Sequence, residues 1–131
     1  MAAAGRRAAG GAAGAAGAPG PRWFVKTETF AKPFPEVREH LEAHKAWVRG
    51  LQRRGEVAQI TSGYRVDAEG RPGGGGLMFF QAESHAAAEA LCRLDPLVKS
   101  GSVAWKVQGF VPEVGDIRCV EGGEWVHKRA Q

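Results

Sequence analysis

The segment Glu36–Arg54, EVREHLEAHKAWVRGLQRR, decides the fold, because it is the longest stretch of the chain with one clear periodicity. Its inward positions recur at spacings of four and three, which places them on one face of a helix: Val37, Leu41, His44, Val48 and Leu51. Pro33 and Pro35 come before this segment and Gly55 follows it, as is typical of helix boundaries. We therefore predict a long amphipathic helix that packs one face against another layer.

Strand patterns flank this helix on both sides. Trp23–Phe30, WFVKTETF, is aromatic and β-branched, with Val25, Thr27 and Thr29 alternating with Lys26 and Glu28. Further along the chain, the patterns predict a strand over Val57–Val66, a glycine-rich turn over residues 69–76 and a strand over Leu77–Phe80. They then predict a short helix over Ser84–Leu94 and a last strand over Val103–Val111. The order β-α-β-β-α-β is that of the ferredoxin-like fold, of class α+β. It predicts a four-stranded antiparallel sheet with two helices on one face.

The third predicted strand is apolar on both sides, although a sheet with helices on one face alone should alternate apolar and polar residues. The open face of the sheet therefore needs a cover, and the simplest cover is the same face of a second subunit. We predict a homodimer through the open sheet face, which makes a dimeric α+β barrel.

Composition and charge divide the chain into three parts. Residues 1–22 are mostly Ala and Gly with three arginines and no acid, and we expect a disordered leader, with an organellar transit peptide as one interpretation. Residues 23–111 form the predicted ferredoxin-like domain. Residues 112–131 form a C-terminal extension, with a possible hairpin over Ile117–Val120 and Glu124–Val126.

Net charge, the length of apolar runs and the number of cysteines argue against several classes of protein. The formal charge of +4 falls to +1 outside the leader, where 15 basic residues face 14 acidic ones, so we expect no nucleic-acid partner. No apolar run approaches the roughly 20 residues that span a bilayer, so we expect no membrane partner. Two cysteines are too few for a disulfide framework. We expect a cytoplasmic protein, or an organellar one if residues 1–22 are a transit peptide.

Asp95 is the most unusual residue of the predicted domain. It follows the Ser84–Leu94 helix and precedes Pro96, so it is expected in the last turn, where the helix dipole disfavours an acid. Its spacing from Leu91 places it on the buried side. His44 breaks a rule as well, because it lies in the middle of an apolar stripe. Since both helices cover one sheet face, the two side chains can meet, and a carboxylate that orients an imidazole is typical of a general base. A buried ion pair with no chemistry is the alternative.

Two segments resemble a known family. The sequence from His44 to Gly55, HKAWVRGLQRRG, is similar to the HxAWLRGLxxRG helix of the YciI-like (YCII-related) family, and LDPLVKSG, which contains Asp95, is similar to its DPFVxAG segment. The resemblance runs from about Trp23 to Val111. It implies a ferredoxin-like dimer, and it implies that His44 and Asp95 match the pair proposed as catalytic in that family. One branch of the family removes chloride from a chlorinated hydroxyhydroquinone.

Other residues and departures bear on the substrate. Ser62-Gly63-Tyr64 stands where the family has Gly-Pro, which puts the pocket in doubt. We name His40, Trp47 and Tyr64 as candidate pocket residues, each with a plain packing or surface role as the alternative. His40 and His44 have a spacing that suits a metal, but no third ligand is evident, so we expect no metal.

Two other interpretations of the sequence are rejected. The adjacent Phe79 and Phe80 point to opposite faces, unlike the aromatics of an RNA-recognition strand. The glycine run precedes a strand and lacks the GK[ST] ending, so it is no phosphate loop.

Two functions remain open at this point. The first is a small cofactor-independent enzyme, an isomerase or a lyase of the dehydrochlorinase type, in which His44 transfers a proton of a small molecule and Asp95 orients it. The second is a non-catalytic dimer that binds a small molecule or a protein and keeps the pair for structure. The sequence does not name a substrate.

Overall fold

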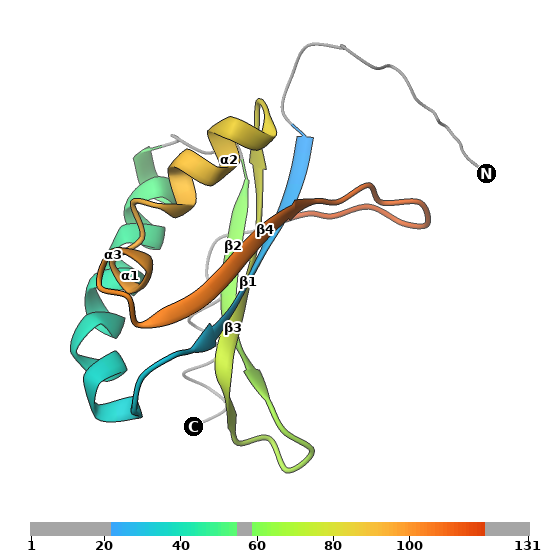
Figure 1. Cartoon of the computed structure of the whole chain (residues 1–131). Coiled ribbons are helices and arrows are strands. Elements are labelled where there is room, and N and C mark those ends of the chain that lie inside the picture. The colour runs from blue at the N-terminus through green and yellow to red at the C-terminus, as the bar shows by residue number, and fades with distance from the viewer. Residues whose placement is uncertain (1–21, 55–58, 120–131) are drawn as a thin grey trace.

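The computed structural model of the chain describes residues 22–54 and 59–119 (Figure 1). Four strands and three helices follow one another as β1 Arg22–Phe30, α1 Phe34–Arg54, β2 Ile60–Val66, β3 Pro72–Ala82, α2 His85–Cys92, α3 Pro96–Lys99 and β4 Val103–Gly109. Apart from the one-turn α3, this is the predicted element order. The predicted α+β class and the ferredoxin-like arrangement are confirmed.

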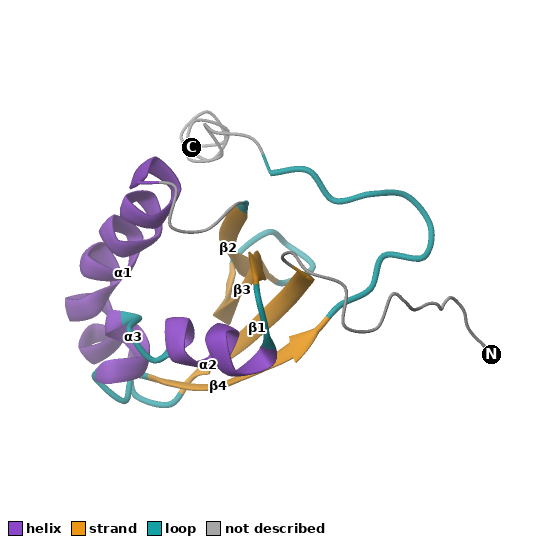
Figure 2. Ribbon diagram, turned by 90° about the horizontal axis from the view of Figure 1, so that it is seen from above, coloured by secondary structure: helices purple, strands orange, loops and turns teal. Residues whose placement is uncertain are grey.

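The strands form one antiparallel sheet in the order β2-β3-β1-β4. All three helices lie on one side of it, and the other side is free of helices (Figure 2). Side chains alternate between the two sides along each strand. The helix side of β1 therefore carries Phe24, Lys26 and Glu28, which are all buried. Val25 and Thr27 point to the open side and are half-buried.

The core between the helices and the sheet has two parts. The larger cluster is built around Phe80 and Met78 of β3, Leu51 of α1 and Cys92 of α2. The smaller one joins Val37 of α1, Leu97 of α3 and Val103 of β4. The predicted stripe of α1 therefore points inward, with its two ends fully buried and its centre, which includes His44, half-buried.

The prediction of a turn over residues 69–76 is wrong, because β3 already begins at Pro72 and takes in the whole glycine run. The chain turns earlier, where Asp67 accepts hydrogen bonds from the backbone of Glu69 and Arg71 and Gly70 takes a positive φ of 82°. A Cβ on Gly76 would lie 2.8 Å from the backbone oxygen of Gly63 and 3.2 Å from Glu28 Oε2. Glycine is needed here because neighbouring strands and side chains occupy the space, not because the chain turns.

The residues after β4 leave the sheet edge and run on the open side (Figure 1). The Phe110 ring packs edge-on against Phe79 with 5.6 Å between ring centroids, and the backbone N–H of Cys119 donates to the amide oxygen of Gln59 at 3.0 Å. Most of the predicted C-terminal hairpin and residues 1–21 of the predicted leader lie outside the described residues, whereas Arg22 belongs to β1. No helix among the described residues is long and apolar enough to cross a membrane.

Candidate functional site

Asp95 does not lie in the last turn of α2, so this prediction is wrong. The helix α2 ends at Cys92, two further residues follow, and Asp95 is the N-cap of the next helix, α3. Pro96 explains the change, since a proline is well suited to the first position of a helix and cannot continue the previous one. The Asp95 side chain accepts a hydrogen bond from the backbone N–H of Leu97 at 2.9 Å, which is ordinary capping geometry.

The carboxylate of Asp95 is fully buried and is held by three groups. Its Oδ1 accepts the capping bond and lies 2.8 Å from His44 Nδ1, while its Oδ2 accepts from Lys26 Nζ at 2.5 Å. Burial by itself would raise the pKa of this carboxyl, but the hydrogen bond and charge of His44 and the charge of Lys26 outweigh it and hold the pKa below its ordinary value. Asp95 is therefore an ionised carboxylate.

Lys26 and Glu28 were not recognised from the sequence as part of the site. Both point from β1 toward the helices, with only 1% and 7% of their surface exposed, and Lys26 Nζ lies 2.6 Å from Glu28 Oε1. The pattern contained a signal, because Phe24 and Phe30 flank them at even spacing and belong to the core side. A strand with apolar inward positions at both ends and opposite charges between them indicates a buried ion pair.

His44 is the member of this cluster that is best placed to react. Since the ionised Asp95 can only accept a hydrogen bond, the contact at 2.8 Å puts a proton on Nδ1, and in the neutral form of the ring Nε2 then carries the lone pair. No residue that the structure describes forms a hydrogen bond to Nε2. The His44 side chain keeps 12% of its surface exposed, whereas that of Asp95 keeps none. A small molecule could reach the imidazole and not the carboxylate.

The three candidate pocket residues have different positions. The Trp47 ring lies beside His44, with 6.3 Å between ring centroids, while His40 lies half-buried one turn earlier on α1. Tyr64 is 48% exposed. It shares the helix side of β2 with Ser62, which is exposed too. The helices therefore leave these two positions of β2 open to solvent.

Metal and thiol chemistry find little support among residues 22–54 and 59–119. No group of three His, Cys, Asp or Glu side chains converges there in a way that could hold a metal ion. Cys92 is packed in the core, and burial raises the pKa of its thiol to about 11, so it is not a ready nucleophile.

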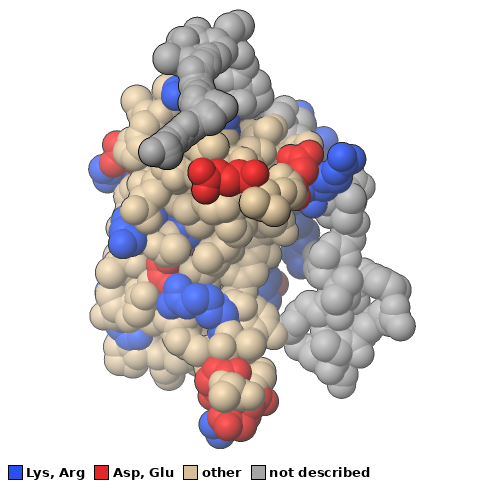
Figure 3. Space-filling view, turned by 90° about the vertical axis from the view of Figure 1, so that its right-hand side faces the viewer, with Lys and Arg blue, Asp and Glu red and all other residues tan. Residues whose placement is uncertain are grey.

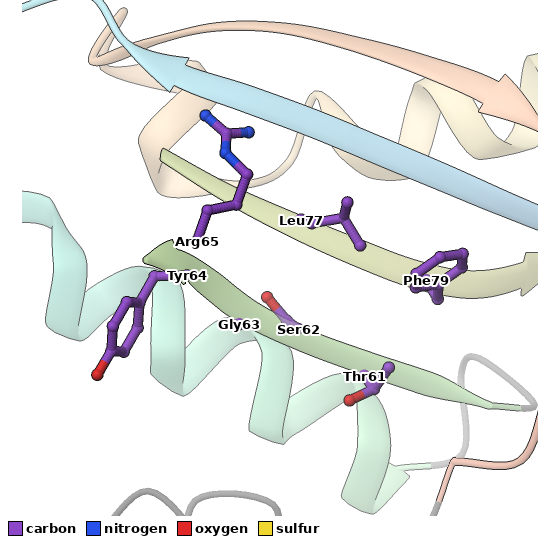
Figure 4. Close-up of a pocket in the computed structure, with 7 residues that line it drawn as sticks. All are labelled: Thr61, Ser62, Gly63, Tyr64, Arg65, Leu77 and Phe79. Atoms are coloured by element: carbon purple, nitrogen blue, oxygen red, sulfur yellow. The ribbon is translucent and has the colours of Figure 1, made fainter. Parts of the chain in front are cut away.

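Two hollows formed by the described residues lie on the open face of the sheet, and neither is lined by His44 or Asp95. One, of about 260 Å³, lies over β2 and β3 beside Arg65, Leu77 and Phe79 (Figure 4). The other, of about 220 Å³, lies over β1 and β4 beside Thr27 and Lys106. Figure 3 looks onto this face and shows broad areas with neither acidic nor basic side chains. We place the candidate site at the buried cluster, because the open face has no comparable arrangement of ionisable groups among the described residues.

Fold and cluster together define a ferredoxin-like α+β protein in which the buried carboxylate of Asp95 contacts the half-buried His44 of α1. The profile of the YCII-related domain matches residues 23–107. The chain therefore belongs to the YCII-related domain family. The match takes in β1 with Lys26 and Glu28, the whole of α1 with His44, and the α2–α3 junction with Asp95.

A solved structure has the same fold. It is 5-chloro-2-hydroxyhydroquinone dehydrochlorinase (TftG) from Burkholderia phenoliruptrix AC1100, in complex with 2,5-dihydroxybenzoquinone. It superposes with a TM-score of 0.56 and 22% sequence identity, over 68% of this chain and 93% of that chain. At this identity the similarity shows the fold alone. A comparison with curated protein sequences gives no significant match.

Proposed function

We propose that this protein is a small cofactor-independent enzyme that uses His44 to transfer a proton of a small molecule, in an isomerisation or an elimination of the dehydrochlorinase type. The observation that carries this proposal is the buried, ionised Asp95 bonded to His44 Nδ1 at 2.8 Å. In the neutral ring this bond leaves Nε2 as the basic atom. Membership of the YCII-related family and the shared fold with a dehydrochlorinase support the proposal.

The proposed chemistry needs only the groups that the cluster supplies. His44 Nε2 takes a proton from an acidic C–H or O–H of the substrate, and the electron pair of that bond moves into the substrate. In an elimination this pair expels a leaving group such as chloride; in an isomerisation His44 returns the proton to another atom. Asp95 keeps the imidazole in the correct tautomer and balances the positive charge that forms on it. A phenolic or lactone-like substrate fits, because such molecules have acidic protons.

We further propose that two copies pair through the open sheet face. Leu77 and Phe79 of β3 and Val25 of β1 lie on this face and are only half-buried within one chain. Pairing would remove their apolar surface from water, which is the usual driving force for a stable dimer.

The alternative is a non-catalytic dimer that binds a small molecule or a protein. One observation favours it: Asp95 caps α3 and pairs with Lys26, so the fold has reasons to keep this carboxylate without any chemistry. Neither of these contacts, however, requires a histidine at position 44.

The test uses His44→Gln and Asp95→Asn, with His85→Gln as the matched control. His85 is an exposed histidine of α2 whose ring lies near Glu89 and the backbone oxygen of Val107, away from Asp95. Chloride release from 5-chloro-2-hydroxyhydroquinone is measured first, and binding of 2,5-dihydroxybenzoquinone to the wild type is followed by the chemical shifts of the His44 ring.

We expect His44→Gln to lose turnover by about 100-fold or more while remaining folded, because the general base is gone. Asp95→Asn should lose turnover as well, since an amide no longer fixes the tautomer of His44, and the control should keep it. Equal turnover of wild type and His44→Gln, or no turnover and no binding of any tested ligand near His44, would contradict the enzyme proposal.

A further inference from the structure

Lys26 and Glu28 lie two residues apart on the central strand β1 and so point to the same side, directly beneath the helices. A lysine and a glutamate in such a place cost solvation energy that an apolar pair would not. Stability therefore gives no simple reason for their presence, whereas their contacts join them to the candidate site.

Lys26 is charged in spite of its burial. Burial lowers the pKa of its ammonium group, but the nearby carboxylates of Glu28 and Asp95 outweigh this effect and raise the pKa above the ordinary value. The ammonium group lies 2.6 Å from Glu28 Oε1 and 2.5 Å from Asp95 Oδ2. It therefore bridges the two carboxylates.

The contact with Asp95 fixes how that side chain is presented to His44. Oδ1 is already used by the Leu97 N–H and by His44, and Lys26 is the only group among the described residues bonded to Oδ2. Without Lys26, one oxygen of a fully buried carboxylate would lose this partner. Protonation of Asp95 would then avoid the energetic cost of a buried charge that lacks a partner. A protonated Asp95 can donate a hydrogen bond itself, so His44 would no longer need its proton on Nδ1.

We propose that Lys26 is a positioning residue that keeps Asp95 ionised and oriented toward His44, and that Glu28 in turn holds Lys26 in this place. The inference rests on the proposed function, which it extends from a pair to a cluster of four residues. The charge balance of the cluster supports this inference. With neutral His44, one ammonium group faces two carboxylates and the net charge is −1; a further proton on His44 makes the cluster neutral. The imidazolium that forms during proton transfer thus has its counter-charge in place.

The other titratable groups on the elements around the cluster do not provide this charge. These groups include His40 on α1, Tyr64 on β2, Cys92 on α2 and Lys99 on α3. Cys92 stays uncharged because burial raises its thiol pKa to about 11. Lys99 is exposed at the surface. The helix side of β4 carries Val103, Trp105 and Val107, which do not titrate.

The experiment is an NMR titration of the full chain without ligand, with carbon-13 in the Asp carboxyl groups and nitrogen-15 in the His rings. The variants are Lys26→Met, Glu28→Gln and the double variant, with Lys106→Met on the opposite face of the sheet as the control. We expect Lys26→Met to raise the pKa of Asp95 and to move the His44 proton partly from Nδ1 to Nε2. Glu28→Gln should lower the pKa of Lys26, followed at its Cε carbon. Lys106→Met should change neither.

The outcomes separate this inference from the proposed function. An unchanged Asp95 titration and an unchanged His44 tautomer in Lys26→Met would overturn the role of Lys26, and an unchanged Lys26 titration in Glu28→Gln would overturn that of Glu28. If Lys26→Met does not fold, the double variant replaces it, since removing one charge of each sign leaves the net charge unchanged; its Asp95 pKa should again lie above that of the wild type. Full turnover in His44→Gln would overturn the enzyme proposal and leave these ligand-free titrations as expected.

Discussion

Each face of the sheet departs at its centre from the pattern that usually distinguishes a covered face from an open one. The face beneath the helices contains the charged Lys26 and Glu28 at its centre, whereas the open face contains Leu77, Phe79 and Val25. Whether a side chain can be buried therefore depends on its interaction partners as well as on its polarity. The buried charges of Lys26 and Glu28 are tolerated because each has a counter-charge within 2.6 Å. In our proposals the chemistry takes place on the covered face, and a second chain binds to the open face.

The largest expected effect tests whether the covered charges depend on one another. Lys26→Met should destabilise the protein by about 3–5 kcal/mol, because it leaves two buried carboxylates without their cation. Lys106→Met, at an exposed lysine of β4 on the other face, should change the free energy of unfolding by less than about 0.5 kcal/mol. Urea unfolding at matched protein concentration measures both. Equal effects of the two variants would remove the distinction between the faces.

The second prediction concerns the open face. Phe79→Asp should weaken the proposed homodimer by roughly 10- to 100-fold, because a charge would replace about 1.5–3 kcal/mol of apolar burial. Light scattering after size exclusion, over a range of micromolar concentrations, measures the mass. Ala46→Asp, at an exposed position on α1, is the matched control and should leave the mass unchanged. A wild-type protein that is a monomer at these concentrations would contradict the pairing.

The third prediction concerns the glycines of the sheet. Gly76→Ala should cost about 1–3 kcal/mol, since the new Cβ would come within 2.8 Å of the Gly63 backbone oxygen and press on Glu28. Gly63→Ala on the neighbouring strand has nothing within 4 Å of its Cβ and should be neutral or slightly stabilising. Thermal unfolding of the two variants provides the comparison. A tolerated Gly76→Ala would show that the Gly63 backbone and Glu28 can both shift without loss of stability.

The smallest effect is the pH dependence that Asp95 gives to stability. Its folded pKa lies below the unfolded value of 3.8, so the folded protein binds fewer protons between these two values. The stabilisation is therefore fully present above pH 3.8 and is lost as the pH falls through the folded pKa. Lys26 behaves in the opposite sense at high pH, because its pKa is raised and its contribution is lost as the pH rises through that value.

Urea midpoints measured from pH 7 down to pH 3 check the prediction for Asp95. The wild type should lose stability toward the acid end more steeply than Asp95→Asn, which has no carboxyl to protonate. Parallel curves would mean that Asp95 has the same pKa in the folded and unfolded chains.

Much of the fold could be predicted from the sequence because its signals are local. The stripe from Val37 to Leu51 and the strand patterns around it depend on neighbours within a few residues, and they led to the observed element order. The glycine run misled the prediction, because glycine is equally typical of a turn and of a strand that another backbone approaches closely. Only the distance between β3 and its neighbours distinguishes the two.

The site was predictable in part. His44 and Asp95 each stood out by breaking a local rule, and the structure places them in contact, although Asp95 does so as the cap of α3 and not from the end of α2. Lys26 and Glu28 gave only a weak signal through the flanking Phe24 and Phe30, since charges alternate with other residues on any half-exposed strand. Their burial depends on which side of β1 the helices cover, and that is a property of the whole fold.

The close approach of Glu28 to Gly76 couples two parts of the chain that are far apart in the sequence. A relative with a larger residue at position 76 would press on the glutamate in this orientation, so the two positions should vary together among related sequences. Lys-x-Glu in the first strand with paired glycines in the third would then mark the members that share this charge cluster. Family members that lack both features would need other side chains to orient their aspartate. Members with and without the charge cluster should therefore differ in how strongly their histidine binds a proton.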